Sequence, residues 1–409
     1  MAAVSLRGTA GAVARPRLEL ADLVRRHGPG YEQTHVLAPV QRRALRAIAT
    51  CRTAALGGHQ ETCDHCGHIR VSYNSCGNRH CPKCQTLQKE RWLAARRAEL
   101  LPIPYFQVVF TLPHRLNALA QGNPRVIYRL LFRAAADTLL AFGRDRRRLD
   151  GLLGITAILH TWGQTLSQHL HVHCLVTGGA LAEDGSRWGP SRPAFLFPVR
   201  ALAEVFRAKF LAGLQQAYDT GQLAFAGGTA DLAQRHTWGR FLQPLWATDW
   251  VVYAKRPFAG PDQVLAYLGR YTHRVALSND RLVSLDEGRV QFRWRDYADH
   301  DRVKVMTLAV DEFLRRFLLH VVPRGFCRIR HFGLVANRHK RQRLARCRRL
   351  LDHPEPAAPT PESTGDLFQR LTGIDLTECP VCGRGRFVVT TILLPVAPRS
   401  SSAHPFDTS

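Results

Sequence analysis

The chain has 409 residues, a length that predicts roughly two to three domains. Apolar residues make up 45% and charged residues 22%, which is ordinary for a folded soluble protein and excludes wholesale disorder. The 57 Lys and Arg residues against 32 Asp and Glu leave a net charge of +25, which favours a polyanionic partner. That partner is nucleic acid or an anionic membrane. Because no apolar run approaches the ~18 residues of a spanning helix, we expect no membrane association.

The N-terminal part of the chain predicts helices followed by a cysteine-rich module. Apolar residues recur at helical spacing across residues 14–50. Residues 51–85 are dense in Cys and His and poor in periodic apolar residues, as in a small module held together by metal. Residues 85–101 predict a connecting helix.

The central part predicts a β-α-β-β-α-β order, which is typical of the ferredoxin-like fold. Its elements are a strand at 105–111, a helix at 124–142, strands at 154–161 and 169–177, a helix at 199–218 and a strand at 250–255. Pro261 predicts the start of a further helix, and two more strands follow at 289–295 and 303–310. The expected fold class is therefore α+β.

Two C-x2-C pairs predict a zinc site. Cys63 and Cys66 are separated by 14 residues from Cys81 and Cys84, and such knuckles can place four thiolates around one Zn²⁺. A site closed by four cysteines is structural, so this zinc should stabilise a fold. Five further candidate ligands leave a second zinc open: Cys51, His59, His68, Cys76 and His80.

A third pair, Cys379 and Cys382, lies near the C-terminus without evident partners. Spacing alone offers four candidates to complete a site with it: Cys327, Cys347, His331 and His339.

Three histidines alternate along the expected strand at 169–177. Because side chains alternate between strand faces, His169, His171 and His173 share one face while apolar residues take the other. Imidazoles in this arrangement suit a divalent cation, Mg²⁺ or Mn²⁺, with His171 and His173 as ligands. The alternative is that they are satisfied core residues, which strict alternation disfavours.

Tyr267 and Tyr271 are four residues apart on the helix expected after Pro261, so their side chains share one helical face about 6 Å apart. Arg270 and Arg274 make that face cationic, in a position to contact nucleic acid. A tyrosine pair alone is more typical of a half-buried core. Beside a metal-binding strand, the pair indicates attack of a tyrosine hydroxyl on a phosphodiester that the metal polarises.

Five phrases carry a resemblance to a known family. The His-Val-His of 171–173 and the Tyr-x3-Tyr of 267–271 resemble those of HUH endonucleases, and the wider sequence is similar to bacterial rolling-circle insertion-sequence transposases of the IS91 type with their N-terminal zinc-binding domain. The phrases are CRTAALGGH (51–59), YNSCGNRHCPKCQ (73–85), HTWGQTLSQHLHVHCLV (160–176), YLGRYTHRVALSN (267–279) and RIRHFGLVANR (328–338).

The resemblance implies a metal-dependent nickase and strand transferase that acts on single-stranded element ends and target DNA. It also implies a 5′-phosphotyrosine intermediate and an RRM-like antiparallel catalytic sheet, in a cytoplasmic, nucleoid-associated protein. Tyr271, in the tighter motif RYTHR, ranks first as nucleophile and Tyr267 second. Many relatives use a third metal ligand, for which His160, Gln164 and His169 are candidates.

Two alternatives remain at this stage. A relaxase or rolling-circle replication initiator would use the same chemistry, although such proteins usually lack this zinc module. A non-catalytic zinc-finger DNA-binding protein would retain only DNA binding.

Residues 313–351 contain no acidic residue and twelve basic ones, so we expect this stretch, including Arg341 and Arg343, to contact the DNA backbone. The expected organisation is a helical segment (1–50), a zinc-binding domain (51–90), an HUH catalytic domain (91–312), a basic region (313–352), a linker (353–366) and a tail with the last C-x2-C pair (367–409).

Overall fold

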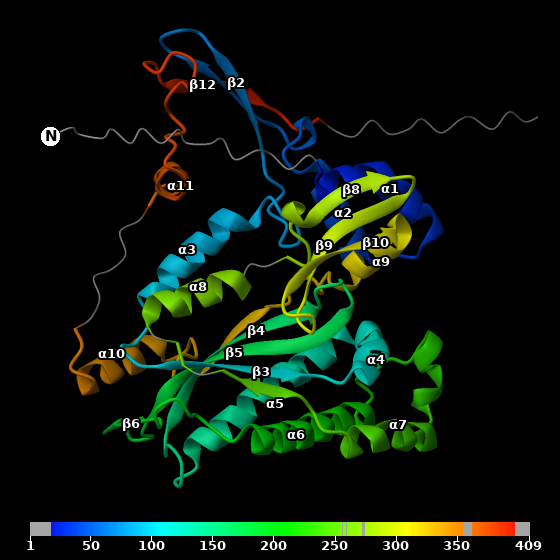
Figure 1. Cartoon of the computed structure of the whole chain (residues 1–409), viewed down its shortest axis with the longest axis vertical. Helices are drawn as coiled ribbons and strands as arrows, with labels where there is room; N and C mark the ends of the chain where they lie inside the picture. The colour runs from blue at the N-terminus through cyan, green and yellow to red at the C-terminus, as the bar shows by residue number, and fades with distance from the viewer. Residues whose placement is uncertain (1–17, 256, 259, 272–274, 355–361, 397–409) are drawn as a thin grey trace, which may run out of the picture.

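A computed structural model describes residues 18–255, 257–258, 260–271, 275–354 and 362–396. Their paired strands form three antiparallel sheets. Figure 1 shows the largest sheet at the centre, a second sheet beside the N-terminal helices, and a third in the zinc-binding region. No helix in these ranges combines the length and apolar character needed to cross a membrane.

The central sheet confirms the expected ferredoxin-like arrangement. Its spatial order is β11-β4-β5-β3-β7, so the four strands of the β-α-β-β-α-β unit lie as β4-β5-β3-β7 and β11 extends one edge. The strands are β3 (Tyr105–Thr111), β4 (Leu152–Trp162), β5 (Gln168–Leu181), β7 (Val252–Ala254) and β11 (Ile329–Gly333), with the short β6 (Trp188–Pro190) paired to β5.

Helices cover both faces of this sheet (Figure 1). On one face, α5 (Pro124–Arg144) and α6 (Val199–Asp219) form the main core with apolar side chains of β3, β4 and β5. On the other face, α3 (Gln85–Arg97) and α8 (Pro261–Tyr271) pack on a smaller apolar cluster. Two further helices flank the first layer: α4 (Asn117–Gly122) and α7 (Arg235–Ala247).

The second sheet has the order β10-β9-β8 and shares a core with the N-terminal helices. Apolar faces of these elements pack together, which joins residues near the start of the chain to residues near position 300. The elements are α1 (Leu20–Thr34), α2 (Pro39–Thr50), β8 (Leu282–Asp286), β9 (Arg289–Asp296), β10 (Arg302–Ala309) and α9 (Val310–Leu319). We call this unit the flanking module.

The turn between β4 and β5 is anchored in the flanking module. Leu166 has a φ of 59°, in the left-handed region, and its fully buried side chain joins the flanking module's core. Arg316 Nη1 donates to the Thr165 carbonyl oxygen over 3.1 Å, and His320 Nε2 lies 3.0 Å from the Leu166 carbonyl oxygen. The two long strands of the central sheet therefore end inside the neighbouring module.

The third sheet joins the cysteine-rich segment to the C-terminal part of the described chain. Strand β1 (Gly58–Cys63) pairs with β2 (Ile69–Tyr73) on one side and with the C-terminal β12 (Phe387–Leu393) on the other. A Cβ at Gly58 would collide with the Ser72 carbonyl oxygen, so the close strand approach requires glycine there. The C-terminal segment is thus part of the cysteine-rich module.

The remaining helices are α10 (Lys340–Leu350), beside β11 in sequence, and α11 (Thr364–Thr372), which lies near α3. The Ser363 hydroxyl caps α11 by accepting a bond from the Asp366 N–H over 3.1 Å.

We predict that His320 makes the fold sensitive to acid. Burial holds its pKa at about 4, below the 6.5 expected in the unfolded chain. Between these values the unfolded state binds a proton that the folded state does not. The free energy of unfolding should therefore decrease by up to roughly 3 kcal/mol as pH is lowered from about 6.5 to about 4. Chemical denaturation at several pH values measures this decline.

The variant His320→Gln should show a shallower decline, whereas the exposed control His353→Gln should keep the wild-type slope. An unchanged slope in His320→Gln would contradict the assignment.

Candidate metal centres and the tyrosine helix

Three histidines meet on the α8 side of the central sheet. Strands β4 and β5 place His160 directly opposite His171, and His173 follows two residues along the same face. One ring nitrogen from each of these three residues lies within 4.8 Å of the other two, and the side chains are 3%, 9% and 7% exposed. Their convergence from two strands indicates a shared cation site.

The structure brings together His160, His171 and His173 and leaves out the other two candidates for a third ligand. His169 lies two residues before His171 on β5, nearer the β4–β5 turn, with its ring centroid 4.8 Å from that of His171. Burial and the neighbouring His114 lower the pKa of His169. Gln164 lies in the β4–β5 turn, where its side-chain amide donates to the Tyr297 hydroxyl over 2.7 Å.

Hydrogen bonds orient two of the three imidazoles. His171 Nδ1 lies 2.8 Å from the His169 carbonyl oxygen, which can only accept, so Nδ1 carries the proton and Nε2 the lone pair. Metal-binding histidines commonly use one nitrogen in this way and ligate through the other. His173 Nδ1 lies 3.3 Å from Gln107 Nε2 on β3, a contact that the sequence did not indicate. Because an amide nitrogen only donates, ligation through His173 Nε2 requires the opposite orientation of the Gln107 amide, with its oxygen toward the ring. The residues fit a divalent cation.

Helix α8 brings a tyrosine to this cluster. The Tyr267 side chain is 2% exposed and packs with Val264 and Leu268 against the sheet. Its hydroxyl lies 3.2 Å from His173 Nδ1. A tyrosine hydroxyl and three candidate metal ligands therefore share one buried face.

The other residues of this motif are described only in part. Tyr271 is the last residue of α8 and Arg270 precedes it, but their side chains lie outside the described part of the structure. Arg274 lies outside it altogether. Their roles as nucleophile and as DNA contacts remain predictions.

The expected grouping of Cys63, Cys66, Cys81 and Cys84 around one zinc is wrong. Cys81 and Cys84 lie with Cys51 and Cys76, whereas Cys63 and Cys66 lie with two other cysteines. The reason is the β1–β2 hairpin, because Cys51 and Cys76 flank its base while Cys63 and Cys66 lie at its tip. Six residues of β1 separate the two levels by about 20 Å.

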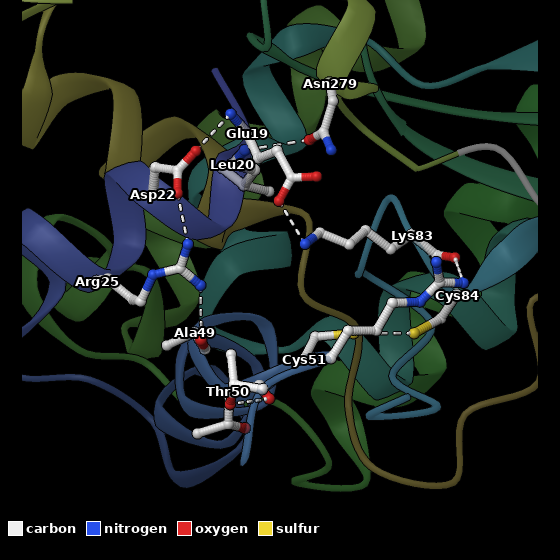
Figure 2. A network of polar contacts seen from close by, with 12 residues as sticks. Glu19, Leu20, Asp22, Arg25, Ala49, Thr50, Cys51, Lys83, Cys84 and Asn279 are labelled. Atoms are coloured by element: carbon white, nitrogen blue, oxygen red, sulfur yellow. Dashed lines mark hydrogen bonds and ion pairs between the residues drawn. The ribbon is translucent and has the colours of Figure 1, made fainter. Parts of the chain in front are cut away.

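The first group, which we call the base cluster, consists of Cys51, Cys76, Cys81 and Cys84. The sulfur of Cys84 lies 3.5 Å from that of Cys51 and 3.6 Å from that of Cys76. Sulfurs about 3.8 Å apart are expected for tetrahedral zinc with bonds of about 2.3 Å. Figure 2 shows Cys51 and Cys84 beside Lys83, whose ammonium group pairs with Glu19 ahead of α1. The base cluster thus also ties the flanking module to the hairpin.

The second group, the tip cluster, consists of Cys63, Cys66, Cys379 and Cys382. The Cys63–Cys382 and Cys66–Cys379 sulfur distances are both 3.7 Å, which again fits tetrahedral zinc. Backbone N–H groups of Gly385 and Arg384 help to lower the pKa of the Cys382 thiol to about 6, which favours the thiolate. The ligands join positions more than 300 residues apart, which sequence spacing could not indicate.

The partners suggested by spacing for Cys379 and Cys382 are wrong. Cys327 is exposed, Cys347 is buried in an apolar cluster with Leu344, and the His331 ring bonds to Thr156. His339 caps α10 from outside that helix. None of these four belongs to a cysteine or histidine cluster among the described residues.

The basic stretch is largely folded, and several of its arginines hold the structure together. Arg343, Arg346 and Arg348 donate to the carbonyl oxygens of Gly333, Gly185 and Ala98, over 2.9, 2.7 and 2.6 Å. Arg341 is exposed. The DNA contact expected for this stretch remains a prediction, but for Arg343 a role in folding accompanies it.

Two family models match separate parts of the chain. Residues 23–112 match the family described as "Transposase zinc-binding domain", and residues 154–343 match the one described as "Putative transposase". The first match covers the base cluster, and the second covers the histidine cluster and α8. With the cysteine geometry, the first match supports Zn²⁺ as a cofactor.

Two relatives that match most of the chain extend these findings. The chain is 50% identical over 384 residues to "Putative transposase y4qJ" of Sinorhizobium fredii (strain NBRC 101917 / NGR234), covering 93% of this chain and 96% of that protein. It is 28% identical over 365 residues to "Transposase for insertion sequence element IS801" of Pseudomonas savastanoi pv. phaseolicola, covering 87% and 85%. No solved structure matches the chain. Identity of this extent over most of both chains reflects common descent, so the chain belongs to the IS91-type family of insertion-sequence transposases, enzymes that process DNA.

Proposed function

We propose that this transposase nicks single-stranded DNA at the ends of its insertion sequence and joins the 5′ end to a tyrosine of α8. One observation carries the proposal: the Tyr267 hydroxyl lies 3.2 Å from His173, inside a cluster of three histidines. Nucleophile and candidate metal ligands must lie this close to act on one phosphodiester.

In this proposal His160, His171 and His173 hold a divalent cation, Mg²⁺ or Mn²⁺. When bound there, the cation offsets negative charge on the scissile phosphate. The His169 carbonyl fixes the His171 ring, and Gln107 steadies His173. These contacts hold the imidazoles in place before DNA binds, which lowers the cost of reaching the reactive geometry.

The reaction exchanges one phosphate ester for another. The tyrosine oxygen bonds to phosphorus, the bond from phosphorus to the 3′ oxygen breaks, and the proton lost by tyrosine is balanced by the one gained by the 3′-hydroxyl. The phosphotyrosine retains the energy of the ester, so a 3′-hydroxyl can later attack it and join the strand to a target. Two tyrosines permit two such joints, with Tyr271 first and Tyr267 second.

This sequence of joints is rolling-circle transposition, with single-stranded element ends and target DNA as partners, in the bacterial cytoplasm at the nucleoid. Membership of a transposase family favours this use over conjugative or replicative uses of the same chemistry. A protein that had kept only DNA binding would tolerate changes in the histidine cluster, which the second prediction below tests.

The first prediction concerns the nucleophile. Tyr271→Phe should lower the yield of covalent protein–DNA adduct by at least about 1,000-fold without weakening DNA binding, because only the reacting oxygen is lost. Tyr267→Phe should remove the second joint but spare the first. Single-stranded element-end DNA, Mg²⁺ and a denaturing gel measure the adduct.

The exposed Tyr253 on β7 supplies the control, since Tyr253→Phe should react like the wild type. Undiminished adduct in Tyr271→Phe would reject that residue as the first nucleophile.

The second prediction concerns the cation. His160→Ala, His171→Ala and His173→Ala should each reduce nicking by at least about 100-fold, because each removes a metal ligand. His169→Ala is the matched control, because it lies on the same strand and face but outside the cluster. Nicking in Mg²⁺ by the triple variant would place the metal site elsewhere.

The third prediction concerns zinc. The wild-type protein should hold two zinc ions per chain, one in each cysteine cluster, by elemental analysis. Replacing Cys379 and Cys382 with Ser should remove one ion, and replacing Cys81 and Cys84 should remove the other. The exposed Cys327→Ser should keep both.

A single zinc that is insensitive to changes at Cys379 and Cys382 would contradict the two-cluster assignment. Because structural zinc binding is coupled to folding, each loss should also lower the melting temperature.

A further inference from the structure

An open cleft of about 770 Å³ lies beside the candidate active site. Most of its lining comes from α3 with the residues just before it, from Gly269 of α8, from residues within 275–281, and from strand β9 with Tyr297 beyond it. Gln164 of the β4–β5 turn and Val303 of β10 complete the lining. Zinc-binding domain, catalytic sheet and flanking module therefore meet here.

One lining residue connects this cleft to the histidine strands. Gln164 lies in the β4–β5 turn, four residues after His160. Gly269 lies on α8 between the two tyrosines in sequence, but on the helix face that meets Leu93 of α3. A strand whose phosphate sits at the histidine cluster can therefore reach this cleft past the β4–β5 turn.

Arg281 holds the cleft walls together. Its guanidinium donates to the carbonyl oxygens of Gln164, Ala276 and Arg293, which belong to the β4–β5 turn, the loop after α8, and β9. The Gln164 amide adds a bond to the Tyr297 hydroxyl. The floor of the cleft is thus fixed relative to the histidine strands.

The charge of the lining is positive. Lys89, Arg281, Arg293 and Arg295 line the cleft with a single carboxylate, that of Asp280, and Lys89 itself pairs with Glu90 over 2.9 Å. Nearby Asp296 and Asp299 both pair with Lys304, over 2.8 and 2.9 Å, and Asp299 also lies 3.8 Å from Arg302, so two cations offset these two carboxylates. The lining therefore suits an anionic ligand.

Apolar and aromatic surface lies between these charges. Arg295 pairs with Val303 across the β9–β10 ladder, and Arg293 pairs with Val305. The two valines are 60% and 55% exposed, and the Tyr297 ring is 65% exposed. Exposed apolar groups alternating with arginines on a sheet suit a ligand with both phosphates and accessible flat bases.

We infer that the cleft and the outer face of β9–β10 bind the single-stranded DNA that adjoins the scissile phosphate. Arg293 and Arg295 contact its phosphates, and Tyr297 stacks on a base. The inference rests on the proposed function for the position of that phosphate. Single-stranded DNA matches this surface better than a duplex, whose bases are stacked on one another and covered by the backbone.

Fluorescence anisotropy with a labelled oligothymidylate, without divalent cation, tests the inference on the full-length protein. The double variant Arg293→Gln/Arg295→Gln should lower the slope of log affinity against log salt by about 1.4, because each lost phosphate contact removes about 0.7. Tyr297→Ala should weaken binding roughly 10-fold, as expected for a lost base stack.

Two control variants distinguish DNA contact from other effects. One tests the loss of positive charge elsewhere on the protein, and the other tests the loss of a bond that stabilises the fold. Arg200→Gln/Arg235→Gln removes the same charge from exposed positions on α6 and α7 and should leave the slope unchanged. Tyr297→Phe loses the bond to Gln164 but keeps the ring, so it should bind like the wild type.

Several results would overturn the inference. An unchanged salt slope in the arginine variant would show that this face does not touch DNA. Equal affinity and slope for a duplex would reject a single-strand site, and a change in sedimentation instead of DNA affinity would assign the face to a second copy of the chain. Failure of the proposed function looks different, because the histidine variants would then still nick DNA.

Discussion

The turn between β4 and β5 is the constraint on which the arrangement of the site depends. Leu166 adopts a left-handed backbone, which costs a non-glycine residue about 1 kcal/mol, and burial of its side chain in the flanking module offsets this. Arg281, Arg316 and His320 bond three successive carbonyl oxygens of the turn. His160 and His171 lie on the two strands that this turn connects. The module that fixes the turn therefore also fixes the histidine cluster.

The two cysteine clusters extend the same principle to the ends of the chain. The base cluster lies between the flanking module and α3, and α3 packs against α8. The tip cluster holds the C-terminal strand against β1. Zinc in these positions would stabilise the scaffold around the reacting groups and take no part in the reaction, as expected of sites closed by four thiolates.

Local patterns predicted much of the catalytic sheet. Alternation along residues 169–177 placed His171 and His173 on one face correctly, because the period of a strand is fixed by its backbone. The order of helices and strands was sufficient to predict the ferredoxin-like sheet, which the structure confirms. Which of His160, Gln164 and His169 lies beside His171 and His173 depended on the register of the β4–β5 hairpin. Counting outward from the Trp162–Gln168 pair would have placed His160 opposite Leu170, and only the register shift between His160 and Trp162 brings it opposite His171.

Contacts between distant segments were not predictable in this way. The spacing of Cys63, Cys66, Cys81 and Cys84 is compatible with one zinc, and only the length of β1 separates the two pairs. Cys379 and Cys382 find their partners through pairing of β12 with β1, to which no local pattern points. The density of arginines in α10 suggested a DNA contact, but Arg343, Arg346 and Arg348 also stabilise backbone carbonyls.

The central claim is that a tyrosine of α8, next to the histidine cluster, becomes joined to DNA. Proteolysis of the covalent complex followed by mass spectrometry tests it most directly, since it identifies the modified side chain without altering the protein. The account predicts a nucleotide phosphate on Tyr271 or Tyr267. Attachment at any other residue, or nicking of the strand with no covalent complex, would contradict it.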